Sequence, residues 1–163
     1  MKGFSLVELM VVVTVIMVLA GMGAVSLSKF NHNQNLDERK EELISDFKLA
    51  RNMAITNQLP SNVTSGSLKY IRITLNSGIS VSADAILVGS ESNPRNYFSK
   101  KNESIRNTAS FGFSIENGRL MNGNGVFVSS PVCFTLYLNE DTNDKKYVKI
   151  DTSGLIYEED NCN

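Results

Sequence analysis

Histidine is almost missing from this 163-residue sequence, because His32 is its only example. A single imidazole excludes a multi-histidine zinc cluster and a histidine proton relay, and it leaves His32 as the one histidine on which a catalytic triad could be built. Cysteine is also scarce, and Cys133 and Cys162 lie far along the chain from His32, which argues against a cysteine nucleophile activated by histidine. We therefore expect a protein that is not an enzyme and that holds no cofactor.

A large excess of charge of either sign is absent as well. The 16 lysines and arginines nearly balance the 17 aspartates and glutamates. Such a balance excludes a strong whole-chain field that would attract nucleic acid or acidic lipid. The length leaves room for one domain of ordinary size together with one long helix.

Charge is missing altogether between Leu9 and Ser28. The run Leu9–Leu27 has roughly the twenty apolar residues that a helix needs to cross hydrocarbon. Lys2 precedes the run, and the positive-inside rule then places its beginning on the cytoplasmic side. Two alternatives remain open, namely a plain membrane anchor and a secretory signal peptide that is removed by cleavage in the small-residue stretch Ala20–Ala24.

Glu8 stands at the edge of this apolar run. A carboxylate that enters a membrane is energetically costly and usually has a designated partner there. A charged side chain close to the interface can instead reach water. The physics of this one residue leaves both interpretations open.

The residues around Glu8 carry a motif, the stretch GFSLVE at residues 3–8, which is followed directly by the apolar run. This stretch resembles the signature of type IV prepilins and of the pseudopilins of type II secretion. The resemblance implies that prepilin peptidase cuts after Gly3, which leaves residues 1–3 as the leader, and methylates the new amino terminus at Phe4. It also implies that Glu8 pairs with that amine on a neighbouring subunit and so sets the axial stagger of a filament.

The same resemblance implies a location and a set of partners. Residues 4–28 would form a single span of the inner, cytoplasmic membrane before assembly and the core helix of a pilus or pseudopilus afterwards. The partners would be prepilin peptidase, other pilin or pseudopilin subunits and an inner-membrane assembly platform. The rest of the chain would lie outside the cytoplasm.

Proline is absent from Phe4 to Leu59, so one continuous helix can extend beyond the membrane. Its second half, residues 29–59, is amphipathic and is expected to end before Pro60. The apolar residues of this half recur at helical spacing and are Leu36, Leu43, Ile44, Phe47, Ala50 and Ala54. We expect this stripe to pack on the remainder of the protein.

Part of this second half, Leu43–Gln58, resembles a segment of the FimT/GspH family of minor pilins and pseudopilins. An Asn-Gly-Arg step at residues 117–119, which follows an aromatic-rich segment, belongs to the same resemblance. Together they imply a minor subunit rather than a major one.

Beyond Pro60 the hydrophobic period changes from helical to alternating, which predicts an antiparallel β-rich globular head over residues 60–163. The alternating segments are residues 70–75, 111–115, 134–138 and 147–150. Turns are expected at residues 76–78, 116–118 and 152–154, each of which ends in glycine. Residues 90–108 are polar and are expected to form a long exposed loop. The predicted fold class is therefore α+β, with a long N-terminal helix packed on an antiparallel sheet.

The two cysteines fall inside this head, which the family resemblance places outside the cytoplasm, where thiols oxidise. Many members of the family close a C-terminal region with a disulfide, so the resemblance implies a bond between Cys133 and Cys162. Two free thiols are the alternative.

Two other segments invite a binding function. Residues 139–144 (NEDTND) cluster oxygen ligands that suit calcium, but they lack the glycine and the terminal glutamate of an EF-hand loop, so we favour an exposed hairpin turn and no metal. The segment from Arg95 to Arg106 is basic and offers phosphate contacts, with a solvated loop as the alternative. The tail at residues 155–160 (LIYEED) is acidic, unlike the basic tails of DNA-binding relatives, and argues against nucleic acid as a partner.

These observations lead to one main hypothesis, a minor type IV pilin or pseudopilin that is processed after Gly3 and joins or primes a filament. A tip adhesin, a DNA-uptake pilin of a competence system and a major pilin are the alternatives.

Overall fold

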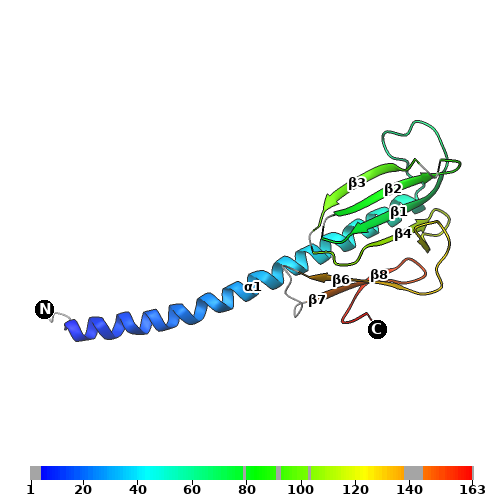
Figure 1. Ribbon diagram of the computed structural model, residues 1–163. Coiled ribbons are helices and arrows are strands. Elements are labelled where there is room, and N and C mark those ends of the chain that lie inside the picture. The colour runs from blue at the N-terminus through cyan, green and yellow to red at the C-terminus, as the bar shows by residue number, and fades with distance from the viewer. Residues whose placement is uncertain (1–4, 79, 91–92, 103, 138–144, 163) are drawn as a thin grey trace. The chain divides into compact units, whose positions relative to one another are not determined.

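A computed structural model of the chain describes residues 5–78, 80–90, 93–102, 104–137 and 145–162, apart from the side chains of residues 20–29 and 32–33. The contacts divide the chain into two units, residues 1–35 and residues 36–163. We call the second unit the head. Helix α1 (Leu6–Ile55) begins in the first unit and ends in the head (Figure 1).

Asn57 terminates α1. This residue adopts a left-handed conformation with a φ of 51°. Its N–H donates to the carbonyl of Ala54 at 3.0 Å, and the N–H of Gln58 donates to the carbonyl of Met53 at 2.9 Å. These two bonds form a Schellman motif, which satisfies the last free carbonyls of a helix. The helix therefore ends earlier than the sequence indicated, because asparagine tolerates the left-handed region and no proline is needed to stop the helix.

The head contains two antiparallel sheets (Figure 1). The first has the order β3-β2-β1-β4-β5, with strands β1 (Leu68–Asn76), β2 (Ser80–Leu87), β3 (Arg95–Lys101), β4 (Ala109–Ser114) and β5 (Leu120–Asn122). The second has the order β6-β7-β8, with strands β6 (Val132–Tyr137), β7 (Lys145–Ile150) and β8 (Ile156–Glu159). The predicted α+β class, a helix packed on antiparallel sheets, is confirmed.

The alternating segments of the sequence fall within or overlap β1, β4, β6 and β7, whereas β2, β3, β5 and β8 have no counterpart among the predicted strands. The three expected turns are present, because Gly78, Gly118 and Gly154 have φ values of 68°, 66° and 82°. The loop expected over residues 90–108 is a wrong prediction, since β3 occupies seven of these residues. Tyr97 and Phe98 explain the difference, because they are half-buried and pack against the core.

The second half of α1 supplies one wall of the head's core. Every residue of the predicted stripe is at most 5% exposed: Leu36, Leu43, Ile44, Phe47, Ala50 and Ala54. The opposing wall comes from inward-facing residues of both sheets, among them Ile71 and Ile73 of β1 and Val148 and Ile150 of β7, which are all fully buried. The amphipathic pattern of residues 36–54 is thus explained by packing on two sheets at once.

Three phenylalanines from three different elements meet in this core. The ring of Phe47 on α1 lies 5.2 Å from that of Phe111 on β4 and 5.5 Å from that of Phe134 on β6, measured between centroids. The rings of Phe111 and Phe134 are 5.1 Å apart. Phe47 therefore joins the helix to both sheets, and edge-on ring contacts of this kind add to the burial of apolar area.

The turns at Gly118 and Gly154 pack directly against each other. A side chain on Gly154 would collide with the carbonyl oxygen of Gly118, and both glycines lie close to the guanidinium of Arg51 on α1. That guanidinium donates from Nε to the same Gly118 carbonyl at 3.3 Å. The close approach requires glycine at these turns, and it ties the end of each sheet to the helix.

Replacing Phe47 with alanine should remove the contact that joins the helix to both sheets. We expect the F47A head to lose about 3–5 kcal/mol of unfolding free energy, the range for deleting a buried aromatic ring. The measurement is urea unfolding of the full-length protein in detergent micelles, followed by circular dichroism. Leu49→Ala on the same helix is the control, because Leu49 is 43% exposed. Equal losses in both variants would contradict the role given to Phe47.

Candidate functional site

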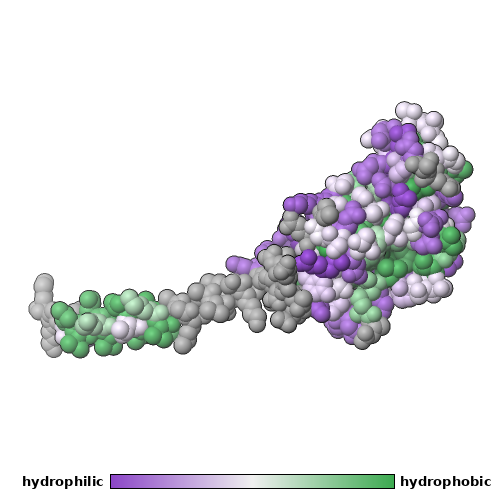
Figure 2. Space-filling view, in the orientation of Figure 1, coloured by the Kyte–Doolittle hydropathy of each residue, from purple (hydrophilic) through white to green (hydrophobic). Residues whose placement is uncertain are grey.

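The described apolar side chains of the first unit are exposed on all sides of α1. Between residues 6 and 19 the large hydrophobic side chains keep between 42% (Val13) and 73% (Leu6) of their surface accessible. Figure 2 shows hydrophobic residues covering this part of the helix. Even the hydroxyl of Thr14 is satisfied internally, because it donates to the carbonyl of Val11 at 2.8 Å. A helix that is apolar all round requires an apolar environment or a bundle of partners.

No helix within the described residues reaches the length and hydropathy of a membrane-crossing segment.

Glu8 is an exposed residue in the first turn of α1. Its backbone N–H donates to the carbonyl of Ser5 at 3.0 Å, which closes the first turn of the helix. A carboxylate is favoured there by the partial positive charge of a helix N-terminus. Among the described residues it forms no ion pair. The other two predicted processing residues, Gly3 and Phe4, lie outside the described residues.

Cys133 on β6 and Cys162 in the C-terminal tail are joined by a disulfide, with their Cα atoms 5.7 Å apart. Cys162 follows β8 by three residues, and β7 lies between β8 and β6 in the sheet. The tail therefore crosses β7 to reach β6, so the bond fastens the last residues of the chain across the whole second sheet. A disulfide of this kind suits a protein that functions outside the cytoplasm.

Lys40 is a buried charge on the apolar side of α1, with 7% of its surface exposed. Its Nζ lies 2.9 Å from a carboxylate oxygen of Glu158 on β8 and 3.2 Å from one of Asp37. Asp37 is shared, because Lys146 of β7 reaches it at 2.9 Å. These four residues connect α1 to two strands of the second sheet, and the buried charge of Lys40 would be costly if it were left unpaired.

The pKa values of this cluster reflect the pairing. Burial alone would lower the pKa of Lys40, but its hydrogen bonds to Glu158 and Asp37 outweigh burial, so the pKa is raised above its ordinary value. The hydrogen bond from Lys146 lowers the pKa of Asp37, and that from Lys40 lowers the pKa of Glu158. Each charged form is thus stabilised by its neighbour in the folded head.

A second buried charge, Asp46, connects α1 to the first sheet. Asp46 is 4% exposed, and one of its carboxylate oxygens lies 2.6 Å from Nζ of Lys100 on β3. This bond raises the pKa of Lys100. Near the same edge the hydroxyl of Tyr97 donates to the carbonyl of Gln58 just beyond the helix, and burial raises its pKa to about 12. The helix is thus fixed to β3 on one flank and to β8 on the other.

Sequence reasoning missed Lys40 and Asp46, although a signal existed. Lys40 lies four residues after Leu36 and three before Leu43, so helical spacing places it on the apolar stripe itself. A charge at such a position predicts a buried partner.

Of the two segments predicted to bind a ligand, the structure describes the basic one but not the oxygen-rich one. The basic segment from Arg95 to Arg106 is β3 and its continuation, and two of its cations are engaged within the head. Lys100 pairs with Asp46, and Arg106 lies over the ring of Tyr137 at 5.8 Å. The oxygen-rich segment at residues 139–144 lies outside the described residues.

The geometry defines a protein class. An apolar N-terminal helix that continues into the core of a disulfide-bonded antiparallel head is the architecture of a pilin-type subunit. The family model described as "Prokaryotic N-terminal methylation motif" matches residues 1–24. The chain is therefore a type IV prepilin-like protein, and the motif indicates a membrane-anchored precursor that is processed by prepilin peptidase and assembles with other pilins. Comparison with curated proteins and with solved structures gave no match.

Opening the disulfide should loosen the second sheet. For a loop that joins residues 133 and 162, the chain-entropy model gives a loss of about 3–4 kcal/mol of unfolding free energy. We expect reductant to lower the urea midpoint of the full-length protein. The C133S/C162S double variant should have that lower urea midpoint already, and reductant should not change it. A wild-type midpoint that does not respond to reductant, although thiol titration shows the bond open, would contradict this expectation.

The Lys40 cluster predicts acid sensitivity. The carboxyl groups of Asp37 and Glu158 have ordinary pKa values of 3.8 and 4.5, and both are lowered in the folded head. The stability that they contribute is therefore present above those values and is lost as the pH falls through the lowered ones. We expect the thermal midpoint of Lys40→Met to fall less than that of the wild type when the pH drops from about 6 to about 3.

Lys48→Met, at an exposed lysine of the same helix, is the matched control and should keep the pH dependence of the wild type. A Lys40→Met profile that parallels both the wild type and this control would contradict the role of the cluster.

Proposed function

We propose that this protein is a minor pilin or pseudopilin of a filament that is assembled at the inner membrane. Residues 1–3 are a leader that prepilin peptidase removes, and residues 4–28 are an anchor before assembly and a filament-core helix afterwards. The second half of α1, which ends at Ile55, carries the helix into the head, and residues 56–163 form the rest of the head. The filament is built by lateral packing of α1 helices.

One observation carries this proposal, namely the methylation-motif match over residues 1–24 on a helix whose described apolar side chains are exposed on all sides. The head buries apolar side chains in a core made of two sheets and a helix. The described apolar side chains of the first unit stay exposed. The uncharged run Leu9–Leu27 supplies the remaining apolar surface. A bilayer, and then neighbouring helices of the same kind, would cover that surface at successive stages.

Processing gives Glu8 a partner. Cleavage after Gly3 creates an amino group at Phe4, which is close to one helical turn from Glu8 along the chain. A carboxylate and an amine are each costly in hydrocarbon, and they satisfy each other when they are brought together. Pairing between the amine of one subunit and Glu8 of the next would set the axial offset between their helices. An uncleaved leader would leave Glu8 without this partner.

The disulfide between Cys133 and Cys162 supports an extracytoplasmic head, because such bonds persist in oxidising compartments. Lys2 before the apolar run supports a cytoplasmic start for the anchor. The segment Leu43–Gln58, with its resemblance to FimT/GspH subunits, favours a minor subunit over a major one. The acidic residues of the tail favour a structural role over the capture of DNA.

The processing residues provide the direct test. Gly3→Asp should leave an uncleaved precursor, because the peptidase reads the small residue before the cut. Glu8→Gln should be cleaved and methylated normally but should be poorly incorporated, since it removes the charge and keeps the shape. Mass spectrometry of the amino terminus reports processing, and sedimentation of sheared filaments reports incorporation.

Ser5→Ala is the matched control within the motif, and both of its readouts should stay at the wild-type level. Normal processing of Gly3→Asp together with normal incorporation of Glu8→Gln would overturn the proposed function.

A further inference from the structure

The two sheets of the head end in four edge strands, β3, β5, β6 and β8. Two of these edges are partly covered within the described residues. Met121 of β5 forms a bridge with Phe127, and Leu136 of β6 forms one with Ile105. No such bridge covers β3 or β8 in the part of the chain that the structure describes. An uncovered edge presents backbone donors and acceptors on which another strand can be added.

The uncovered edges carry opposite charges. Strand β3 holds Arg95, Lys100 and Lys101 and no acidic residue. Strand β8 and the residue after it hold Glu158, Glu159 and Asp160 and no basic residue. Charges on an edge deter pairing with strands of like charge, so contacts between two β3 edges or between two β8 edges are disfavoured. A contact between β3 and β8 is the one combination that these charges favour.

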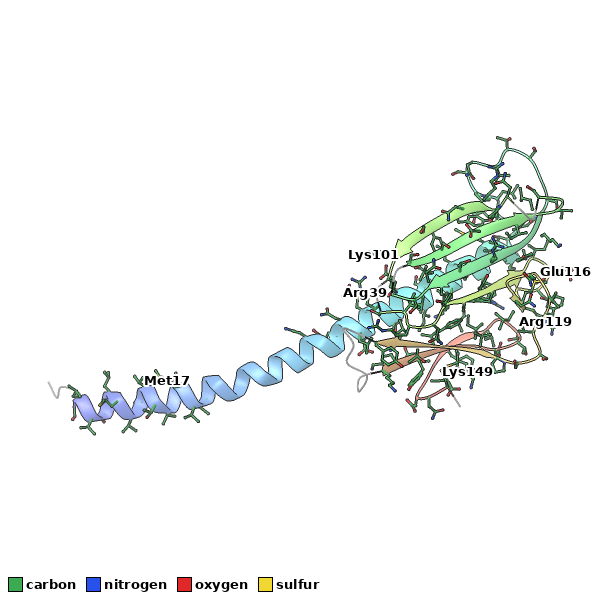
Figure 3. The ribbon with its side chains drawn as sticks, viewed as in Figure 1. Met17, Arg39, Lys101, Glu116, Arg119 and Lys149 are labelled. Carbon is green, nitrogen blue, oxygen red and sulfur yellow. A yellow bond between two sulfur atoms is a disulfide. The ribbon has the colours of Figure 1, made fainter. Side chains whose placement is uncertain are left out.

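The two edges belong to different sheets, because β3 borders the first sheet and β8 borders the second. Figure 3 shows Lys101 at the end of β3 and Lys149, on the strand next to β8, in the second sheet. Lys149 lies 3.0 Å from Glu159 and so marks the β8 edge. Within one chain, β3 and β8 therefore do not pair with each other. Two different surfaces that complement each other form a head-to-tail contact, which repeats from subunit to subunit in a ring or a filament instead of closing as a two-fold dimer.

The charges without partners suggest a register. Most charged groups of these two edges are engaged within the head, as in the pairs of Lys100 with Asp46 and of Glu158 with Lys40. Within the described residues, Arg95 at the start of β3 and Asp160 just after β8 form no ion pair. In an antiparallel pair, the start of one strand lies opposite the end of the other. Arg95 is the first residue of β3 and Asp160 directly follows β8, so antiparallel pairing would place them opposite each other. Beside the start of β8, a hollow of about 260 Å³ against α1 leaves room for an incoming chain.

We infer that β8 of one subunit adds antiparallel to β3 of a neighbouring copy, with Arg95 paired to Asp160 across the contact. This contact rests on the proposed function, since it operates between subunits whose helices are already bundled, and it requires two copies of this minor subunit to lie next to each other in the filament. Strand β8 has only four residues, so the added ladder is short and is effective only at the high local concentration of an assembled filament. The helices bring the subunits together, and the edges fix the rotation of one head against the next.

Site-specific photocrosslinking in cells that produce the full-length protein tests this inference. A benzophenone amino acid replaces Asn96, an exposed residue of β3, and in a second strain it replaces Val12 on the apolar part of α1. We expect oligomers from both positions, and peptide mass spectrometry should identify residues 156–160 in the adducts from Asn96. Replacement of Asn124, an exposed residue in the turn after β5, is the control and should not capture that peptide.

Charge exchange then tests the register. Arg95→Asp and Asp160→Arg should each lower the yield of the Asn96 adduct by about fivefold, and the double variant should restore it to within about twofold of the wild type. The matched control exchanges two charges away from both edges, Glu116→Arg with Arg119→Asp, and should leave the yield unchanged.

Oligomers from Val12 without the β8 peptide from Asn96 would overturn the edge contact alone. The absence of oligomers from both positions would overturn the proposed function as well. Capture of the β8 peptide that does not respond to either single charge variant would overturn the register that pairs Arg95 with Asp160.

Discussion

The contact of Phe47 with Phe111 and Phe134 is the interaction on which the head depends. The two sheets have no strand in common, and each has at least one open edge. A helix that presents one large ring to both sheets converts two marginal layers into one core. The remaining helix contacts are arranged around this centre. Asp46 reaches the first sheet, Lys40 reaches the second, and Arg51 holds the turns at the end of each sheet.

Much of this architecture could be predicted because its signals are local and repetitive. The stripe from Leu36 to Ala54 needed only helical spacing, and the turns at Gly78, Gly118 and Gly154 needed only the conformational freedom of glycine. Strand β2 was missed because five of its eight residues are serine, alanine and aspartate, which have little strand preference. Strand β3 was missed because its basic residues mark it as an edge, and an edge strand in a sequence resembles a polar loop.

The functional residues divide in the same way. The motif at residues 3–8 was readable because its residues are consecutive in the sequence. Buried Lys40 and its partner Glu158 are separated by more than a hundred residues, and only the folded head brings them together. Helical periodicity could have indicated that Lys40 is buried, but no pattern in the sequence could have named the strand that receives its charge. Long-range electrostatic contacts depend on topology, and topology is the part that local patterns specify least.

The buried lysine on α1 also bears on how force passes through such a subunit. If the helix slid along the head by one turn, Lys40 would leave Glu158 and Asp37 would leave Lys146, because Lys40 and Asp37 lie on the helix while their partners lie on β8 and β7. The charged cluster therefore opposes sliding of the helix. It lies only a few residues from Leu36, where the head begins. A pull on the helix would be transferred to the second sheet at that point, and from there through the disulfide to the end of the chain. The part of α1 that belongs to the head would then move under tension together with the second sheet.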